Sequence, residues 1–125
     1  MTAFDALGHL LGPRFSTTLA ARKQNAGNEA HYDEALPDAV AFPESTEEVA
    51  EIVRICAAHG VAIVAFGTGT SLEGQHLAVN GGISLDFSRM NKVLEVHAED
   101  MNVVVQPGVT RKQLNEELRA TGLFF

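Results

Sequence analysis

The sequence predicts an α+β fold, and three observations support this class. Residues 38–66 read as strand, helix, strand, because two short apolar runs flank a segment with helical periodicity. Three further strand-like runs lie between residues 82 and 106, and a capped helix follows them. The composition, 46% hydrophobic and 20% charged, is typical of a globular domain with its own core.

Residues 1–37 are a lead-in to this organised part. FDALGHLL, residues 4–11, has helical periodicity and predicts a short helix. Residues 16–36 are polar and show no clear period, so an irregular segment is expected there. The chain is therefore divided into the lead-in, 1–37, and a main unit, 38–125.

The main unit opens with a βαβ unit. The strand DAVAFP, residues 38–43, is followed by Ser45, and Glu48 three residues later completes a capping-box pattern that begins a helix. This helix is predicted to stop near Gly60. One stripe of it is apolar and is expected to face the core: Val49, Ile52, Val53 and Cys56. VAIVAF, residues 61–66, is apolar without interruption, as in a strand covered on both faces.

The second half of the main unit combines strands with one helix. Turn signals separate three strand-like runs that predict a local meander: GISLDF (82–87), KVLEVH (92–97) and NVVVQ (102–106). The last helix is expected to open at Thr110, with Gln113 at capping-box spacing, and to end at Gly122. The apolar end Leu123-Phe124-Phe125 favours a chain that is the front part of a longer protein, and its exposure predicts self-association.

Charge and cysteine content argue against several functions. Acidic residues number 16 against 9 basic ones, and the basic residues are scattered, so no nucleic-acid partner is expected. Cys56 is the single cysteine and is predicted to be a small core residue. The histidines share no ligand spacing, which predicts no metal site. No apolar run approaches the roughly 18 residues of a membrane span, and no signal peptide is recognisable. A cytoplasmic location, at most peripheral to a membrane, is expected.

The stretch AFGTGTSLEG, residues 65–74, carries the strongest functional signal. Its glycines have P-loop spacing, but Gln75 and His76 stand where a P-loop needs Lys and Ser or Thr. A dinucleotide fingerprint would open a helix, whereas a strand follows here. The remaining interpretation is a non-helical nest, in which several main-chain N–H groups point at one anion with help from the Thr68, Thr70 and Ser71 hydroxyls. A plain glycine-rich connection between strands is the alternative.

Three separated segments closely resemble the FAD-binding domain of the FAD-linked oxidase family related to vanillyl-alcohol oxidase and p-cresol methylhydroxylase. These segments are PDAVAFPESTEEVAEIVRICAAHGVAIVAFGTGTSLEG, GGISLDFSRMNKVLEV and VVVQPGVTRKQLNEEL. The branch with cytochrome-type D-lactate dehydrogenases and glycolate oxidase D subunits is the most similar. The resemblance covers residues 38–125 and implies the first subdomain of that fold, the βαβ unit, plus the start of the second, truncated.

The resemblance also implies a cofactor and a set of residues that bind it. The cofactor is FAD, with its pyrophosphate held by the loop's main-chain N–H groups. The implied binding residues are Phe66, Gly67, Thr68, Gly69, Thr70, Ser71, Gly74, Gln75, Met90, Pro107 and Gly108. Several relatives attach FAD covalently through a loop histidine, and Thr70 occupies that position here, so non-covalent FAD is expected.

The implied activity is oxidation of a small 2-hydroxy acid, such as D-lactate or glycolate, with electrons passed to a further acceptor. The catalytic residues of such enzymes are expected to lie beyond Phe125, so none is assigned. The alternatives are a nucleotide-binding regulatory module and a non-catalytic fragment. Among nearby residues, His76 is expected at the surface, Glu73 is expected to face solvent or cap a donor, and Arg89 is expected to be a solvated turn residue.

Overall fold

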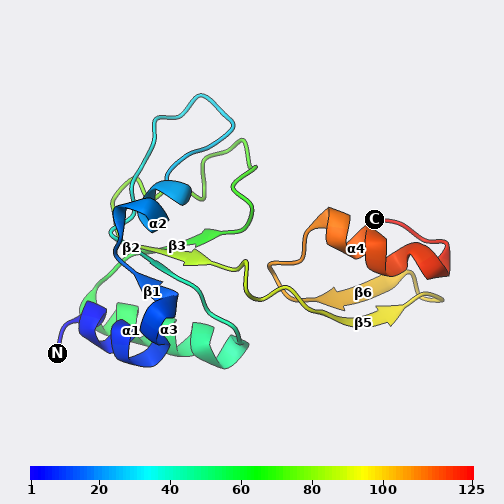
Figure 1. Ribbon diagram of the computed structural model, residues 1–125, viewed down its shortest axis with the longest axis horizontal. Helices are drawn as coiled ribbons and strands as arrows, with labels where there is room; N and C mark the ends of the chain where they lie inside the picture. Colours follow the sequence, from blue (N-terminus) through cyan, green and yellow to red (C-terminus); the bar gives the residue numbers. More distant parts are fainter.

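A four-stranded sheet and a separate two-stranded hairpin organise the chain in the computed structural model, which describes residues 1–125 (Figure 1). The sheet has the order β1-β2-β4-β3, made of Phe15–Ser16, Ala39–Ala41, Ile83–Asp86 and Ile63–Phe66. β2, β4 and β3 run parallel, and β1 is antiparallel to β2 at one edge. The hairpin pairs β5, Val93–His97, with β6, Asn102–Val105.

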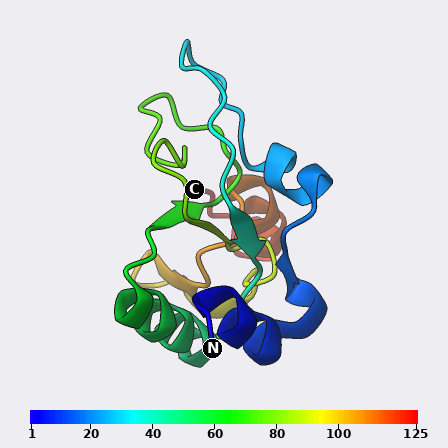
Figure 2. The same cartoon turned by 90° about the vertical axis from the view of Figure 1, so that its left-hand side faces the viewer.

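Four α-helices accompany these strands. They are α1 (Ala3–Leu11), α2 (Leu19–Gln24), α3 (Thr46–His59) and α4 (Arg111–Leu118), with 3₁₀ turns at Gly12–Arg14 and Arg119–Thr121. α1 and α3 lie side by side below the sheet (Figure 2), and α4 lies on the hairpin (Figure 1). The predicted helices at 4–11, after Ser45 and after Thr110 are thus present.

Capping explains where α3 and α4 begin. Ser45 Oγ accepts a hydrogen bond from the Glu48 N–H at 3.2 Å, and Thr110 Oγ1 accepts one from the Gln113 N–H at 3.1 Å. Neither helix start forms a complete capping box, because the side chains of Glu48 and Gln113 bond to groups other than the Ser45 and Thr110 backbone N–H. Gly60 ends α3 in the left-handed conformation at φ 65°, which a glycine adopts without strain.

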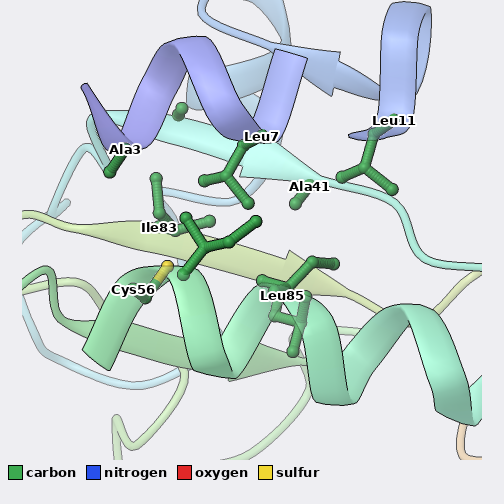
Figure 3. Packing of buried hydrophobic residues seen from close by; sticks show 10 residues of the cluster. Ala3, Leu7, Leu11, Ala41, Cys56, Ile83 and Leu85 are labelled. Atoms are coloured by element: carbon green, nitrogen blue, oxygen red, sulfur yellow. The ribbon is translucent and has the colours of Figure 1, made fainter. Parts of the chain in front are cut away.

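The core lies between the helix pair and the sheet. Figure 3 shows Leu7 and Leu11 of α1 facing Ala41, Ile83 and Leu85 of the sheet. Cys56 of α3 completes this core and is fully buried, as the sequence predicts, and burial raises the pKa of its thiol. The N-terminal helix therefore shares one hydrophobic core with the parallel strands.

The strand at residues 82–87 departs from the predicted meander. β4 lies between β2 and β3, so the two strands of the βαβ unit are not neighbours, and 82–87 joins the parallel sheet instead of a meander. β3 is consequently an edge strand and is only half-buried over most of its length, not covered on both faces. The strands that are paired on both sides and fully buried are β2 and β4.

Two local predictions are also wrong. The segment 16–36 is not wholly irregular, because it contains the six-residue helix α2, which is too short to show a period. Val53 is exposed, and Ile55 takes its place in the buried stripe of α3. Helix α3 packs against α1 as well as the sheet, which turns its buried face toward Ile55.

A close main-chain contact joins the sheet to the hairpin. The Gly108 N–H donates to the Met90 carbonyl oxygen at 2.8 Å, and the Gln106 N–H donates to that of Lys92 at 2.9 Å. A β-carbon on Gly108 would come within 1.9 Å of the Phe87 carbonyl oxygen. Only glycine fits at position 108 in this arrangement.

Candidate functional site

The glycine-rich loop leaves the carboxyl end of β3, beside the carboxyl end of β4. Phe66, the last residue of β3, is in register with Asp86, the last residue of β4. The two segments that follow, 67–81 and 87–92, therefore start next to each other. Carboxyl ends of parallel strands are the common position for ligand sites in such sheets.

Gly69 gives the loop its shape. Its φ of +72° lies in the left-handed region, and a β-carbon there would come 2.7 Å from Cζ of the Phe66 ring. Phe66 is buried below the loop, so the chain folds back over this ring. By contrast, a β-carbon on Gly67 would meet nothing within 4 Å.

The loop carries a run of hydrogen-bond donors. The main-chain N–H groups of residues 68–71 donate no hydrogen bond within the chain. Thr68 and Thr70 bring their hydroxyls to 3.1 Å from each other, and Ser71 Oγ accepts from the Glu73 N–H at 3.4 Å. Four free N–H groups beside three hydroxyls suit an anion with several oxygens.

These groups surround a hollow of about 200 Å³. Its lining is Ala65, Gly67, Thr68, Gly69, Thr70, Ser71, Gln75 and His76. No carboxylate is among them, and Glu73 is exposed, as expected from the sequence. The lining fits the pyrophosphate of FAD, because it offers donors, small side chains and no negative charge.

The other residues implied to bind FAD lie outside this hollow. Gly74 packs against the Tyr32 ring and lines a second hollow, of about 540 Å³, between residues 32–36 and 73–81. Met90, Pro107 and Gly108 lie together at the junction of sheet and hairpin, where Met90 is buried. The structure thus brings Gly67, the residues 68–71 and Gln75 together in one hollow and places Gly74, Met90, Pro107 and Gly108 outside it.

Three buried polar residues near the loop were not among the sequence-predicted site residues: Asn25, His76 and Asp86. The expectation that His76 lies at the surface is wrong, since it is 4% exposed and its Nε2 donates to the Gly27 carbonyl oxygen at 3.0 Å. Asn25 Nδ2 donates to Ser84 Oγ at 3.0 Å and to Asp86 Oδ2 at 3.1 Å. A polar Asp86 ending the apolar run ISL was the one available signal.

Two arginines form ion pairs near the start of α3. Arg14 donates to both carboxylate oxygens of Glu48, at 2.8 and 2.6 Å, and this holds the pKa of Glu48 below its usual value. Arg89 lies in the turn after β4, half exposed as expected, but it also pairs with Glu44 at 3.7 Å and lies over the Phe42 ring. These contacts hold the turn against the start of α3.

The structure has neither a metal-binding cluster nor a membrane-spanning helix. No three His, Cys, Asp or Glu side chains are grouped so that they could hold a metal ion. None of the helices has the length and apolar character needed to cross a bilayer.

Comparison with protein families places residues 37–125 in one match, described as an FAD binding domain. The chain is 45% identical over 106 residues to a probable mitochondrial D-lactate dehydrogenase of Danio rerio, which covers 85% of this chain and 21% of that protein. It is 39% identical over 92 residues to glycolate oxidase subunit GlcD of Bacillus subtilis, 74% of this chain and 20% of GlcD. The chain thus spans about a fifth of the length of these relatives.

A solved structure supports the same fold. The crystal structure of p-cresol methylhydroxylase with substrate bound superimposes with a TM-score of 0.85 at 25% sequence identity. The match covers 97% of this chain and 24% of that one. Because nearly the whole chain is covered, the similarity extends into the N-terminal region that precedes the family match at residue 37.

Proposed function

The chain belongs to the FAD binding domain family, and from that membership we propose that residues 66–75 hold the pyrophosphate of FAD. The observation that carries this proposal is the run of N–H groups at residues 68–71, which have no acceptor within the chain and line a hollow free of carboxylates. Such groups hold an anion by oriented dipoles and need no lysine.

The family resemblance extends the proposed contacts to residues around the hollow. Gln75 lines it and offers an amide, and Phe66 supports the loop from below. Gly74, Met90, Pro107 and Gly108 are proposed as further FAD contacts, made where the loop and the junction of sheet and hairpin face the extended cofactor. FAD is long enough to reach beyond one hollow, which allows two separated groups of contacts.

For the complete protein we infer oxidation of a small 2-hydroxy acid, such as D-lactate or glycolate. The relatives named D-lactate dehydrogenase and glycolate oxidase subunit support this substrate class. The substrate would lose two electrons and two protons and become a 2-oxo acid, and the electrons would pass to a separate acceptor. FAD, when bound, supplies the redox chemistry, whereas residues 1–125 supply binding and orientation. The cytoplasmic location stays a prediction, since a relative is named as mitochondrial.

Purification of the native polypeptide that carries residues 1–125 tests this function. A yellow protein whose flavin absorbance is bleached by D-lactate or glycolate, and restored by an electron-accepting dye, supports the proposal. A colourless protein that binds ATP instead supports the alternative of a nucleotide-binding regulatory module. A protein that binds neither would support a non-catalytic role.

A further inference from the structure

His76 is the sole long-range hydrogen-bonded anchor of the glycine-rich segment. Between residues 68 and 81, every other hydrogen bond joins groups within the segment itself. The bond from His76 Nε2 to the Gly27 carbonyl oxygen spans 49 positions of sequence. Because a carbonyl only accepts, Nε2 carries the proton in this bond.

The same imidazole supports the shape of the loop through Phe66. The rings of His76 and Phe66 meet edge to face at 5.5 Å and 80°. The Phe66 ring also lies under Gly69, as described above. The Phe66 ring therefore contacts both His76 and Gly69. A shift of the imidazole would release this ring, which supports the N–H groups of residues 68–71.

The anchor point is itself held to the sheet. Gly27 follows Asn25, and the Asn25 amide bonds to Ser84 and Asp86 of β4. The second oxygen of Asp86 accepts from the Ser88 N–H at 2.9 Å, at the start of the turn after β4. A chain of polar contacts thus connects the loop after β3 with the turn after β4, and all its side chains are buried.

The histidine at position 76 lowers the stability of the fold in one respect. Its Nδ1 is the one buried side-chain nitrogen or oxygen in the chain without a hydrogen-bond partner. An unpaired buried polar atom lowers stability, and an apolar side chain of similar size would avoid that loss. The Gly27 carbonyl is only part-buried, so water could replace the imidazole as its donor.

We propose that His76 is a positioning residue for FAD, which fixes the glycine loop in its anion-binding shape before the cofactor arrives. This inference rests on the proposed role of residues 66–75. It assigns to His76 no contact with substrate and no part in the chemistry. The imidazole acts through Phe66 and Gly27, and its effect is on cofactor affinity, since a preformed site loses less freedom on binding.

The test compares variants of the native polypeptide by FAD fluorescence quenching and by melting of the apoprotein. His76→Leu keeps the bulk and removes the donor, and we expect about tenfold weaker FAD binding with an apoprotein Tm equal to or above that of the wild type. His76→Gln keeps an N–H donor and should bind FAD within about threefold of the wild type. His59→Leu is the matched control. His59 also bonds a carbonyl, that of Ile55, but it ends α3 before β3 begins, whereas the glycine loop follows the other end of β3.

Three results would overturn the proposal. The first is wild-type FAD affinity in His76→Leu. The second is a His76→Leu protein that fails to fold or melts well below the wild type, since that assigns His76 to stability. The third is an equal loss of FAD in His59→Leu. Gly69→Asp separates this inference from the proposed function: if it abolishes FAD binding while His76→Leu does not, only the positioning role fails, and if neither changes binding, the loop is not the FAD site.

Discussion

The Phe66 ring lies under Gly69 so closely that a β-carbon on Gly69 would come 2.7 Å from Cζ of the ring. Because φ at Gly69 is also positive, position 69 is restricted twice, by backbone conformation and by space. A strand residue thus supports the turn that follows it by three positions. This contact determines how the loop presents the N–H groups of residues 68–71.

Replacement of Gly69 by Asp should nearly abolish FAD retention. The new side chain would strain the backbone, push against Phe66 and place a negative charge beside the pyrophosphate site. Flavin absorbance per purified polypeptide measures the loss. Gly67→Ala is the informative partner, since its β-carbon meets no protein atom within 4 Å. It should melt like the wild type yet bind FAD more weakly, and unchanged binding there would place the cofactor elsewhere.

Gly108→Ala should destabilise the fold itself. The added carbon would meet the Phe87 carbonyl oxygen at 1.9 Å, and main-chain atoms cannot move aside as a flexible side chain can. A loss of about 2–3 kcal/mol in the free energy of unfolding is expected from such overpacking. Denaturant unfolding measures it. Gly8→Ala is the control, because Gly8 lies inside α1 with open space around it, and this change should stabilise by roughly 0.5–1 kcal/mol.

The ion pair of Arg14 and Glu48 predicts a pH effect on stability. Hydrogen bonds from Arg14 are the main cause that lowers the pKa of Glu48 from its ordinary value of 4.5. A lowered folded-state pKa stabilises the fold above the unfolded value, and this contribution is lost as pH falls through the folded value. The pair should therefore contribute fully at neutral pH and vanish under strong acid.

Arg14→Met should lower the free energy of unfolding at pH 7 by about 1.5–3 kcal/mol, because it removes two part-buried, charge-assisted hydrogen bonds to Glu48 and one to the Phe42 carbonyl oxygen. The difference between variant and wild type should shrink in acid, below the usual pKa of a glutamate. Arg54→Met is the matched control, since its pair with Glu51 is solvent-exposed and should not change stability measurably. A pH-independent difference would refute the ionic origin of the effect.

Because its C-terminal phenylalanines are exposed, we expect the 125-residue chain to self-associate. Phe124 and Phe125 are 86% and 73% exposed, and they border an apolar groove with Leu114 and Leu118. Light scattering should detect oligomers at high concentration. Phe124→Ser with Phe125→Ser should shift the chain toward monomer, whereas a wild-type monomer at all concentrations would contradict the prediction.

FAD should be held without a covalent bond. The family resemblance implies that Thr70 stands at the loop position where several relatives carry a flavin-linked histidine, and a threonine hydroxyl is not the nucleophile that flavin attachment uses. Acid precipitation of the native protein should leave the yellow colour in the supernatant. A yellow pellet would show covalent attachment and refute the inference from Thr70.

Local signals in the sequence predict α1, α3 and α4 but not the short α2, and long-range strand pairing limits the prediction of the sheet. Ser45 and Thr110 are caps that act within four residues, so the starts of α3 and α4 are readable. The insertion of β4 between β2 and β3 depends on contacts across the whole unit, which no local pattern encodes.

The candidate site is likewise only partly predictable from the sequence. The glycine loop is recognisable because its φ requirement and small residues are properties of the loop alone. The burial of His76 is not, since its partner Gly27 lies 49 positions earlier, in a segment that has no periodic pattern. A histidine in a loop looks the same in sequence whether another loop lies over it or not.

The central claim is that the N–H groups of residues 68–71 bind the diphosphate of FAD. The most direct measurement is a ¹⁵N–¹H correlation spectrum of the 125-residue chain, titrated with FAD or with ADP, where weak binding is sufficient. The amide signals of Thr68, Gly69, Thr70 and Ser71 should shift most in the wild type, and in Gly69→Asp those of Thr68, Thr70 and Ser71 should not respond to the titration. Shifts confined to residues 73–81 or to the hairpin, with none at 68–71, would contradict the claim.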